Sequence, residues 1–203
     1  MNNNFKRFSA IVTIVIVSLL IGGCVSLSWD GIRKLAHPKD YSSYIQQYSL
    51  EFNVPEAIIY AVIKVESNFD PDAESSVGAR GLMQMMPATF LELTSDAHLG
   101  ENLDDDELYD PQVSIKYGTY YLSYLYKYFD NNWDNAICAY NAGMGNVRKW
   151  LNDPEYSDGN GNLYPERIPF EETRNYVQKV NKAIDTYKNL YYQNQKEVVE
   201  NEN

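Results

Sequence analysis

Apolar positions recur along most of the chain at intervals of three and four residues, the period of an amphipathic helix. The clearest such stretch begins at Thr173 and continues to Tyr191. An earlier stretch starts at Pro55, where a first-turn proline does no harm because its missing N–H has no helical partner. That stretch is dense in Ile, Val and Ala, and Asp70-Pro71 ends it. The pattern therefore predicts at least two well-defined helices.

Three further segments fit the same helical period. They are expected at residues 87–93, 110–128 and 133–142, the last closed by Gly143 and Gly145, which suit a left-handed helix cap. Sustained alternation of apolar and polar residues, the mark of a half-buried strand, is not found, and no repeat of about 20 to 50 residues is present. These observations predict an all-α fold.

The amino terminus has the pattern of an export signal. Lys6 and Arg7 precede an almost wholly apolar run at 9–21, which ends in Gly22-Gly23-Cys24. The run is short for a spanning helix, which needs about 20 residues, and its end resembles a bacterial lipoprotein signal with Cys24 as the lipidated residue. The alternative is an uncleaved anchor with Cys24 incidental. Either reading places the folded part on the extracytoplasmic face of a bacterial membrane.

The chain length predicts one folded domain behind this leader. We divide the sequence into residues 1–23, a lipoprotein signal peptide or membrane anchor, residues 24–40, a tether, residues 41–192, the folded domain, and residues 193–203, a polar tail. The formal net charge is -11, and this acidity makes nucleic acid an unsuitable partner. The eighteen tyrosines mainly indicate packing, but some could stack on a sugar polymer.

Neither the cysteines nor the histidines suggest a metal site. Cys138 lies in an apolar helical stretch, as a buried small hydrophobe would, and a lipidated Cys24 would leave it no disulfide partner. His37 and His98 have no ligand residue at metal spacing. We therefore predict no metal and no cofactor.

The segment Asp158-Gly-Asn-Gly-Asn162 begins like a calcium loop. Leu163 stands where such a loop needs glycine, however, and Pro169 stands where it needs a bidentate glutamate. The Asp-Gly and Asn-Gly pairs instead predict a tight turn or small hairpin. The acidic run at 104–107 is expected to precede the helix that starts at Asp110 and to face water.

Glu66 is the residue with the most suggestive placement. It follows Val62 by four positions and Ile63 by three, so it leaves the apolar side of its helix near the C-terminal end. Desolvation and the negative end of the helix dipole both raise the pKa of such a carboxyl. A carboxyl kept protonated near neutral pH can act as a general acid. The alternative is a glutamate at a helix end that points to solvent.

Four blocks together distinguish these readings. They are Glu66-Ser67, Gly78 to Gln84 with Pro87, Ala139-Tyr140-Asn141-Ala142-Gly143, and Glu172-Thr-Arg-Asn-Tyr-Val177. In this order they resemble the catalytic domain of the lytic murein transglycosylases of the soluble-lytic-transglycosylase type, relatives of goose-type lysozyme in fold. The resemblance spans residues 41–191. It implies a single lysozyme-like helical domain with a glycan-binding cleft.

The resemblance also implies a reaction. Glu66 would serve as acid and then base in cleaving the β-1,4 bond between N-acetylmuramic acid and N-acetylglucosamine, leaving a 1,6-anhydro-muramic acid end. The residues that it implies at the substrate are Ser67, Met83, Gln84, Tyr140, Asn141 and Tyr176. Gln84 and Asn141 can hydrogen-bond N-acetyl groups, the tyrosines can stack on sugars, and Met83 can cover an apolar sugar patch. Tyr176 and Met83 could equally be core residues, and Ser67 could only cap the helix.

Other functions remain open from the sequence. A true muramidase would use water, with Glu74 or Asp72 as helper base. A wall-binding lipoprotein would keep the cleft as a grip on glycan, and a third reading makes the aromatic helices a protein-docking bundle. The expected partners are peptidoglycan strands and the membrane that holds the N-terminal anchor, and the protein is expected to be a monomer.

Overall fold

The computed structural model describes residues 12, 13, 15–18, 29 and 31–193. The predicted signal peptide lies mostly outside these residues, and Cys24 lies wholly outside them. Within the described part, no helix is both long enough and apolar enough to cross a membrane. The chain divides into two compact units, residues 1–38 and residues 39–203, and the second holds the helical domain.

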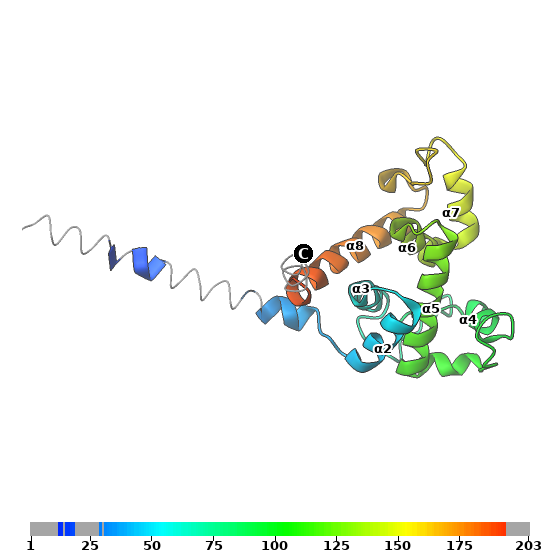
Figure 1. Ribbon diagram of the computed structural model, residues 1–203, viewed down its shortest axis with the longest axis horizontal. Coiled ribbons are helices and arrows are strands. Elements are labelled where there is room, and N and C mark those ends of the chain that lie inside the picture. Colours follow the sequence, from blue (N-terminus) through cyan, green and yellow to red (C-terminus); the bar gives the residue numbers. More distant parts are fainter. Residues whose placement is uncertain (1–11, 14, 19–28, 30, 194–203) are drawn as a thin grey trace, which may run out of the picture. The chain divides into compact units, whose positions relative to one another are not determined.

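The second unit is built from helices joined by loops (Figure 1). In chain order they are α2 (Ser42–Phe52), α3 (Glu56–Glu66), α4 (Pro87–Thr94), the 3-10 helix η1 (Asp105–Tyr109), α5 (Pro111–Tyr128), α6 (Trp133–Ala142), α7 (Met144–Leu151), the 3-10 helix η2 (Pro165–Arg167) and α8 (Glu171–Tyr191). The described residues contain three isolated β-bridges and no strand longer than a bridge. The all-α prediction is therefore confirmed.

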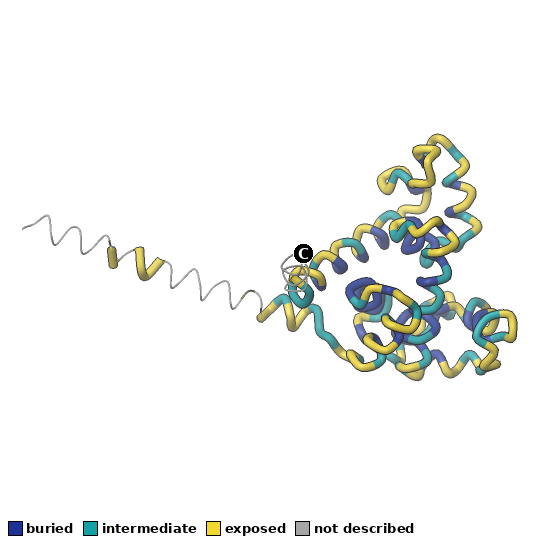
Figure 2. The backbone as a smooth tube through the Cα atoms, in the orientation of Figure 1, coloured by how far each residue is buried: buried dark blue, intermediate teal, exposed yellow. Residues whose placement is uncertain are grey.

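Helix α3 forms the centre of the domain. Its residues 57–63 are all buried, and it packs against α8 and α2 (Figures 1 and 2). A helix that is apolar on every side is stable only when other elements surround it. Helix α5 starts at a well-formed cap, since the Asp110 carboxylate accepts hydrogen bonds from the N–H groups of Gln112 and Val113.

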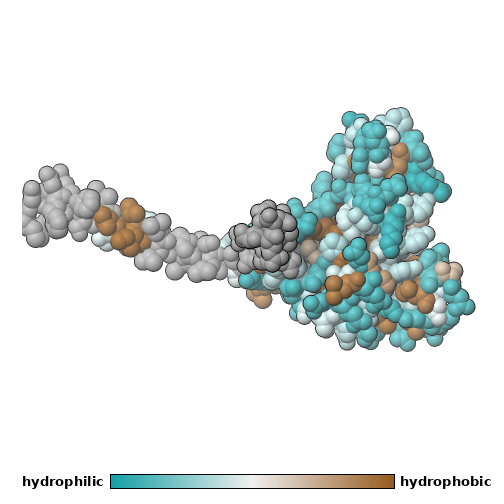
Figure 3. Space-filling view, viewed as in Figure 1, coloured by the Kyte–Doolittle hydropathy of each residue, from teal (hydrophilic) through white to brown (hydrophobic). Residues whose placement is uncertain are grey.

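The buried residues form two clusters. The large one joins α2, α3, α5, α6 and α8, and the small one joins α4, η1 and α5 through Met85, Phe90, Leu93, Leu108 and Tyr117. The loop after α3 passes from the first cluster, where Leu82 and Met83 lie, to the second, where Met85 lies. The outer surface is mostly hydrophilic on the face that Figure 3 shows, with only small apolar areas.

Several local predictions need correction. Helices α2 and α7 lie in segments that the sequence pattern left without a helix. The acidic run precedes α5 and is mostly exposed, as expected, but from Asp105 onward it forms the 3-10 helix η1. Gly143 has the expected positive φ of 83°, but Gly145 lies inside α7. The expected hairpin near Asp158 is confirmed by the bridge between Ser157 and Leu163.

Candidate active site

The last residue of α3 is Glu66, and its carboxyl group is only partly exposed. Burial raises the pKa of this carboxyl to about 7, and the negative charge of Glu172 acts in the same direction. The Tyr176 hydroxyl opposes the rise by donating toward the carboxylate. A carboxyl with a pKa near 7 can both give and take a proton at neutral pH.

Two tyrosines from different helices stand next to Glu66. Burial raises the pKa of Tyr140 on α6 and of Tyr176 on α8, and for both phenols the second cause is the charge of Glu66. The Tyr140 hydroxyl donates a hydrogen bond to the Met83 carbonyl at 2.9 Å. The Tyr176 hydroxyl is buried, and its approach to Glu66 is looser than a standard hydrogen bond. Both phenols therefore leave the Glu66 carboxyl incompletely hydrogen-bonded and poorly solvated.

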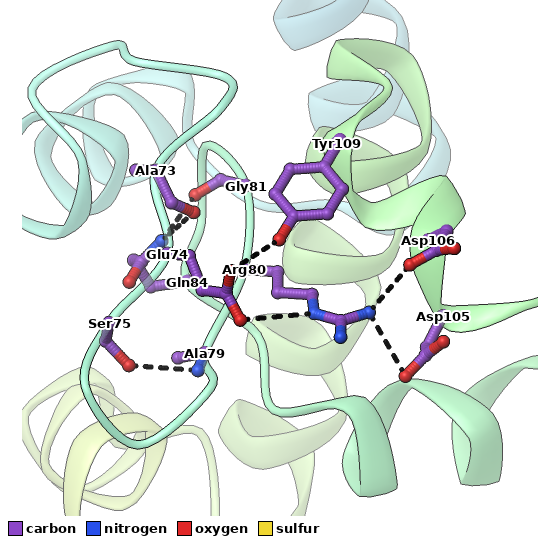
Figure 4. Close-up of polar contacts among 10 residues, drawn as sticks. All are labelled: Ala73, Glu74, Ser75, Ala79, Arg80, Gly81, Gln84, Asp105, Asp106 and Tyr109. Carbon is purple, nitrogen blue, oxygen red and sulfur yellow. Dashed lines mark hydrogen bonds and ion pairs between the residues drawn. The ribbon is translucent and has the colours of Figure 1, made fainter.

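The loop after α3 folds into a small hairpin whose carbonyl groups bind the hydroxyls of Ser67 and Tyr140. The Ser67 hydroxyl donates to the Leu82 carbonyl at 2.8 Å, which fixes the end of α3 to this loop. Gln84 has a positive φ of 46°, and its side-chain amide donates to the carbonyls of Ala73 and Gly81 at 2.9 and 3.0 Å (Figure 4). The amide oxygen of Gln84 is left as an acceptor for a ligand.

A groove of about 250 Å³ lies between this loop, α4, α5 and α6. Its lining residues are Gln84, Met85, Met86, Thr89, Tyr121, Tyr140, Asn141, Ala142 and Gly143. The Asn141 side-chain oxygen accepts a hydrogen bond from Thr173 on α8 at 2.7 Å, so its amide N–H₂ group is oriented for a ligand acceptor. Aromatic faces beside a few fixed amides are suited to a carbohydrate.

The structure thus brings together most of the residues that the sequence singled out. Gln84, Tyr140 and Asn141 line the groove, and Tyr140 and Tyr176 adjoin Glu66. Met83 differs, because its side chain is 0% exposed and packs against the backbone of α5 at Gly118. The Met83 side chain therefore cannot contact a sugar in the way that the sequence predicted, because it is buried. Only its carbonyl group takes part in the site, by accepting the hydrogen bond from Tyr140.

Sequence reasoning did not assign a site role to Met85, Met86, Thr89 or Tyr121, which line the groove, or to Glu172, which acts on the pKa of Glu66. Glu172 lies one helical turn before Tyr176, so the shared helix face was a usable signal. Thr89 and Tyr121 were hidden because helix period alone does not show which face of α4 or α5 borders a cavity, and Met85 and Met86 were hidden because they lie before the start of α4.

The two carboxylates considered as helper bases lie elsewhere. Glu74 accepts a hydrogen bond from the Tyr109 hydroxyl at 3.1 Å and lies 3.9 Å from the Arg80 guanidinium. Asp72 is exposed, and its charge is felt by Tyr41. Across the described residues, no group of three or more His, Cys, Asp or Glu side chains could hold a metal ion.

The chain is similar in sequence to proteins named lytic murein transglycosylases. The soluble lytic murein transglycosylase of Escherichia coli K12 is 37% identical over 161 residues, which are 78% of this chain and 24% of the relative. The membrane-bound lytic murein transglycosylase C of Glaesserella parasuis is 33% identical, over 74% of this chain and 46% of its own length. The chain spans about a quarter of the length of the first of these relatives.

Solved structures agree with these relatives in fold. The 70 kDa soluble lytic transglycosylase of Escherichia coli superimposes with a TM-score of 0.72 at 34% identity, covering 79% of this chain and 26% of that one. An inactive mutant of the lytic transglycosylase Slt from Pseudomonas aeruginosa, in which a glutamate is replaced by glutamine, gives a TM-score of 0.69 at 35% identity, over 77% of this chain and 25% of that chain. The family model for the transglycosylase SLT domain matches residues 43–161. This match covers more than half of the 203 residues, and the protein therefore belongs to the transglycosylase SLT domain family.

Proposed function

We propose that the protein is a lytic transglycosylase that cleaves peptidoglycan glycan strands between N-acetylmuramic acid and N-acetylglucosamine and leaves 1,6-anhydro-muramic acid ends. The observation that carries this proposal is the Glu66 carboxyl, which has a pKa of about 7 and lies next to Tyr140, a residue that lines the sugar-sized groove. Its similarity to proteins named lytic murein transglycosylases supports the substrate class. One of the similar structures is a complex with bulgecin A.

The proposed reaction uses Glu66 twice. Protonated Glu66 gives its proton to the glycosidic oxygen as the bond from that oxygen to C1 of the muramic acid breaks. The carbonyl oxygen of the substrate's own acetamido group then bonds to C1, so no carboxylate nucleophile is needed. The Glu66 carboxylate takes the proton of the C6 hydroxyl, whose oxygen displaces the acetamido oxygen at C1. Glu66 ends protonated, and no water is consumed.

The other groups would orient the sugars. Gln84 offers an amide oxygen, Asn141 offers an amide N–H₂ group, and both are held by hydrogen bonds to the protein. Tyr121 and Tyr140, with ring centroids 5.5 Å apart, offer aromatic surface in the groove. Tyr176 covers Glu66 from α8 and limits its access to water, which favours attack by the C6 hydroxyl over attack by water.

A hydrolytic muramidase is the rival reaction. It would need a base to activate water, and Glu74 is engaged by Arg80 and Tyr109. Glu172 is the carboxylate whose charge is felt by Glu66, so it is the residue to test for that role. A wall-binding lipoprotein that holds glycan without cutting it is the rival outside enzymes.

Mass analysis of digested sacculi separates these functions. The unaltered protein should release muropeptides lighter by one water than the hydrolysis product, and Glu66→Gln should release none while still binding sacculi. Glu51→Gln, an exposed glutamate on α2, is the matched control and should keep full turnover. Reducing ends would establish the muramidase instead. The absence of any release by the unaltered protein would leave the wall-binding function and the protein-docking bundle, which binding to sacculi then separates.

We also propose that the protein works in the cell envelope, tethered by a lipid on Cys24. Support comes from the apolar run before Cys24 and from the similarity to a relative named membrane-bound. Cys24→Ala should then move the protein from the membrane fraction to the soluble fraction if cleavage continues, or leave it as an unprocessed form of higher mass. An unchanged mass and an unchanged distribution would show that the apolar run itself is the anchor.

A further inference from the structure

Residues 73–85, the hairpin beside the groove, are organised around Arg80. Its backbone forms antiparallel bridges with Glu74 on one side and Met85 on the other. The Arg80 N–H donates to the Met85 carbonyl at 3.0 Å, and the Met85 N–H donates back to the Arg80 carbonyl at 3.1 Å. We call residues 73–79 the first arm of the hairpin and residues 81–85 the second arm. A displacement of Arg80 would therefore move both arms.

The second arm of this hairpin is the part that forms the site. The carbonyls of Leu82 and Met83 receive the hydroxyls of Ser67 and Tyr140, and Gln84 lines the groove. Gln84 holds this place with a φ of 46°, a left-handed conformation that a non-glycine residue keeps only when its surroundings impose it. The Gln84 side-chain amide supplies part of that constraint by donating to the carbonyls of Ala73 and Gly81.

The Arg80 side chain supplies a link from the hairpin to η1. Its Nη1 atom lies 3.0 Å from an Asp106 carboxylate oxygen and 3.2 Å from an Asp105 oxygen, while its Nε atom lies 3.9 Å from Glu74 in the first arm. Tyr109, whose ring centroid is 5.7 Å from the guanidinium carbon, closes a further side. Figure 4 shows the guanidinium between Glu74 and the two aspartates. The side chain is 22% exposed, and its Nε atom is buried.

The contact between the hairpin and η1 leaves little room for adjustment. A Cβ atom at Gly81, the residue next to Arg80, would lie 1.9 Å from the Leu108 carbonyl oxygen. The hairpin backbone is thus pressed against the end of η1, and three carboxylates surround the one guanidinium. Without the positive charge these carboxylates would repel one another and weaken the contact between the hairpin and η1, which the hydrogen bond from Tyr109 to Glu74 would still hold in part.

We propose that Arg80 is a positioning residue, which holds residues 81–85 against η1 in the conformation that presents Gln84 to the substrate and the Met83 carbonyl to Tyr140. It would not touch the glycan. The expected effect of Arg80 on turnover rests on the proposed function. The expected effect of Arg80 on the conformation of the hairpin does not. Lys cannot replace Arg fully, because an ammonium lacks the planar fork that reaches Glu74 and the aspartates at once.

The test compares Arg80→Ala and Arg80→Lys with a matched control. Arg167→Ala is suitable, because Arg167 also contacts a glutamate and a tyrosine ring but lies in η2. With purified sacculi, kcat/KM should fall about ten- to a hundredfold for Arg80→Ala, the range for a small misplacement of site groups. Arg80→Lys should recover part of that loss, and Arg167→Ala should lose none.

Amide hydrogen exchange of residues 81–85 gives a readout that needs no turnover. Exchange there should be faster in Arg80→Ala and unchanged in Arg167→Ala. If the unaltered protein is inactive on sacculi, the proposed function fails and exchange still decides the role of Arg80. Unchanged exchange overturns the proposal, and so does faster exchange with full kcat/KM. If Arg80→Ala does not fold, Asp106→Asn, at a side chain 87% exposed, should give a smaller change in the same direction.

Discussion

The titration of Glu66 can be tested through the pH dependence of both stability and turnover. Its carboxyl has a pKa of about 7 in the folded protein against 4.5 as the ordinary value. Between these pH values the unfolded chain has lost the proton that the folded protein still binds. The free energy of unfolding therefore falls as pH rises through this window. The difference of about 2.5 pH units, at about 1.4 kcal/mol for each, gives at most about 3.5 kcal/mol.

Glu66→Gln removes this titration without changing the shape of the side chain. The variant should lose no stability between pH 4.5 and pH 7 from this source, whereas the unaltered protein should lose up to about 3.5 kcal/mol. For a domain of this size the loss corresponds to about 7 to 14 °C in Tm. Thermal unfolding of both proteins at pH 4.5 and pH 8, with Glu51→Gln as control, measures the difference. A difference in Tm that does not change with pH would refute the raised pKa.

Turnover should follow the protonated form of the same carboxyl. Because Glu66 must begin as an acid, kcat/KM should fall about tenfold between pH 6 and pH 8, with the midpoint of the fall near the pKa of about 7. Release of anhydro-muropeptides from sacculi at fixed ionic strength measures it. A fall centred near pH 4.5, or a flat profile from pH 5 to pH 8.5, would contradict the assignment of Glu66 as the acid.

Three further changes test other parts of the structure. Gly81→Ala should lower Tm by at least about 4 °C, because the new Cβ would lie 1.9 Å from a carbonyl oxygen of η1. Gly78→Ala is the control, since Gly78 also has a positive φ but its Cβ would meet nothing within 4 Å, and it should lower Tm less. Equal losses of Tm would show that the positive φ alone accounts for the effect. Tyr140→Phe removes the hydrogen bond to Met83, so the free energy of chemical unfolding should fall by about 1 kcal/mol. The variant should also lose most of its kcat/KM, and full turnover would exclude a role for the hydroxyl. Burial raises the pKa of the Cys138 thiol to about 12, so iodoacetamide should label it at pH 8 only after unfolding, and rapid labelling of the native protein would contradict that burial.

The candidate site shows how far residue patterns alone can lead. The position of Glu66 at the end of an apolar helix was visible in the sequence, because the helical period fixes which residues share a face. That α3 is buried on every side was not visible, since burial of a helix depends on how many neighbours pack around it. The role of Arg80 was also hidden, because Glu74, Asp105 and Asp106 come together only when the hairpin folds against η1.

The sequence by itself determined the helical class, the glutamate at the end of α3 and the family resemblance that a match to residues 43–161 confirmed. These features are local or depend on residues at fixed spacing. The tertiary structure decided that Met83 is core while Met86 and Tyr121 line the groove. It also decided that Glu66 gains its high pKa from burial beside Glu172. Desolvation and charge act through space, and only the packed helices bring those groups within reach of one another.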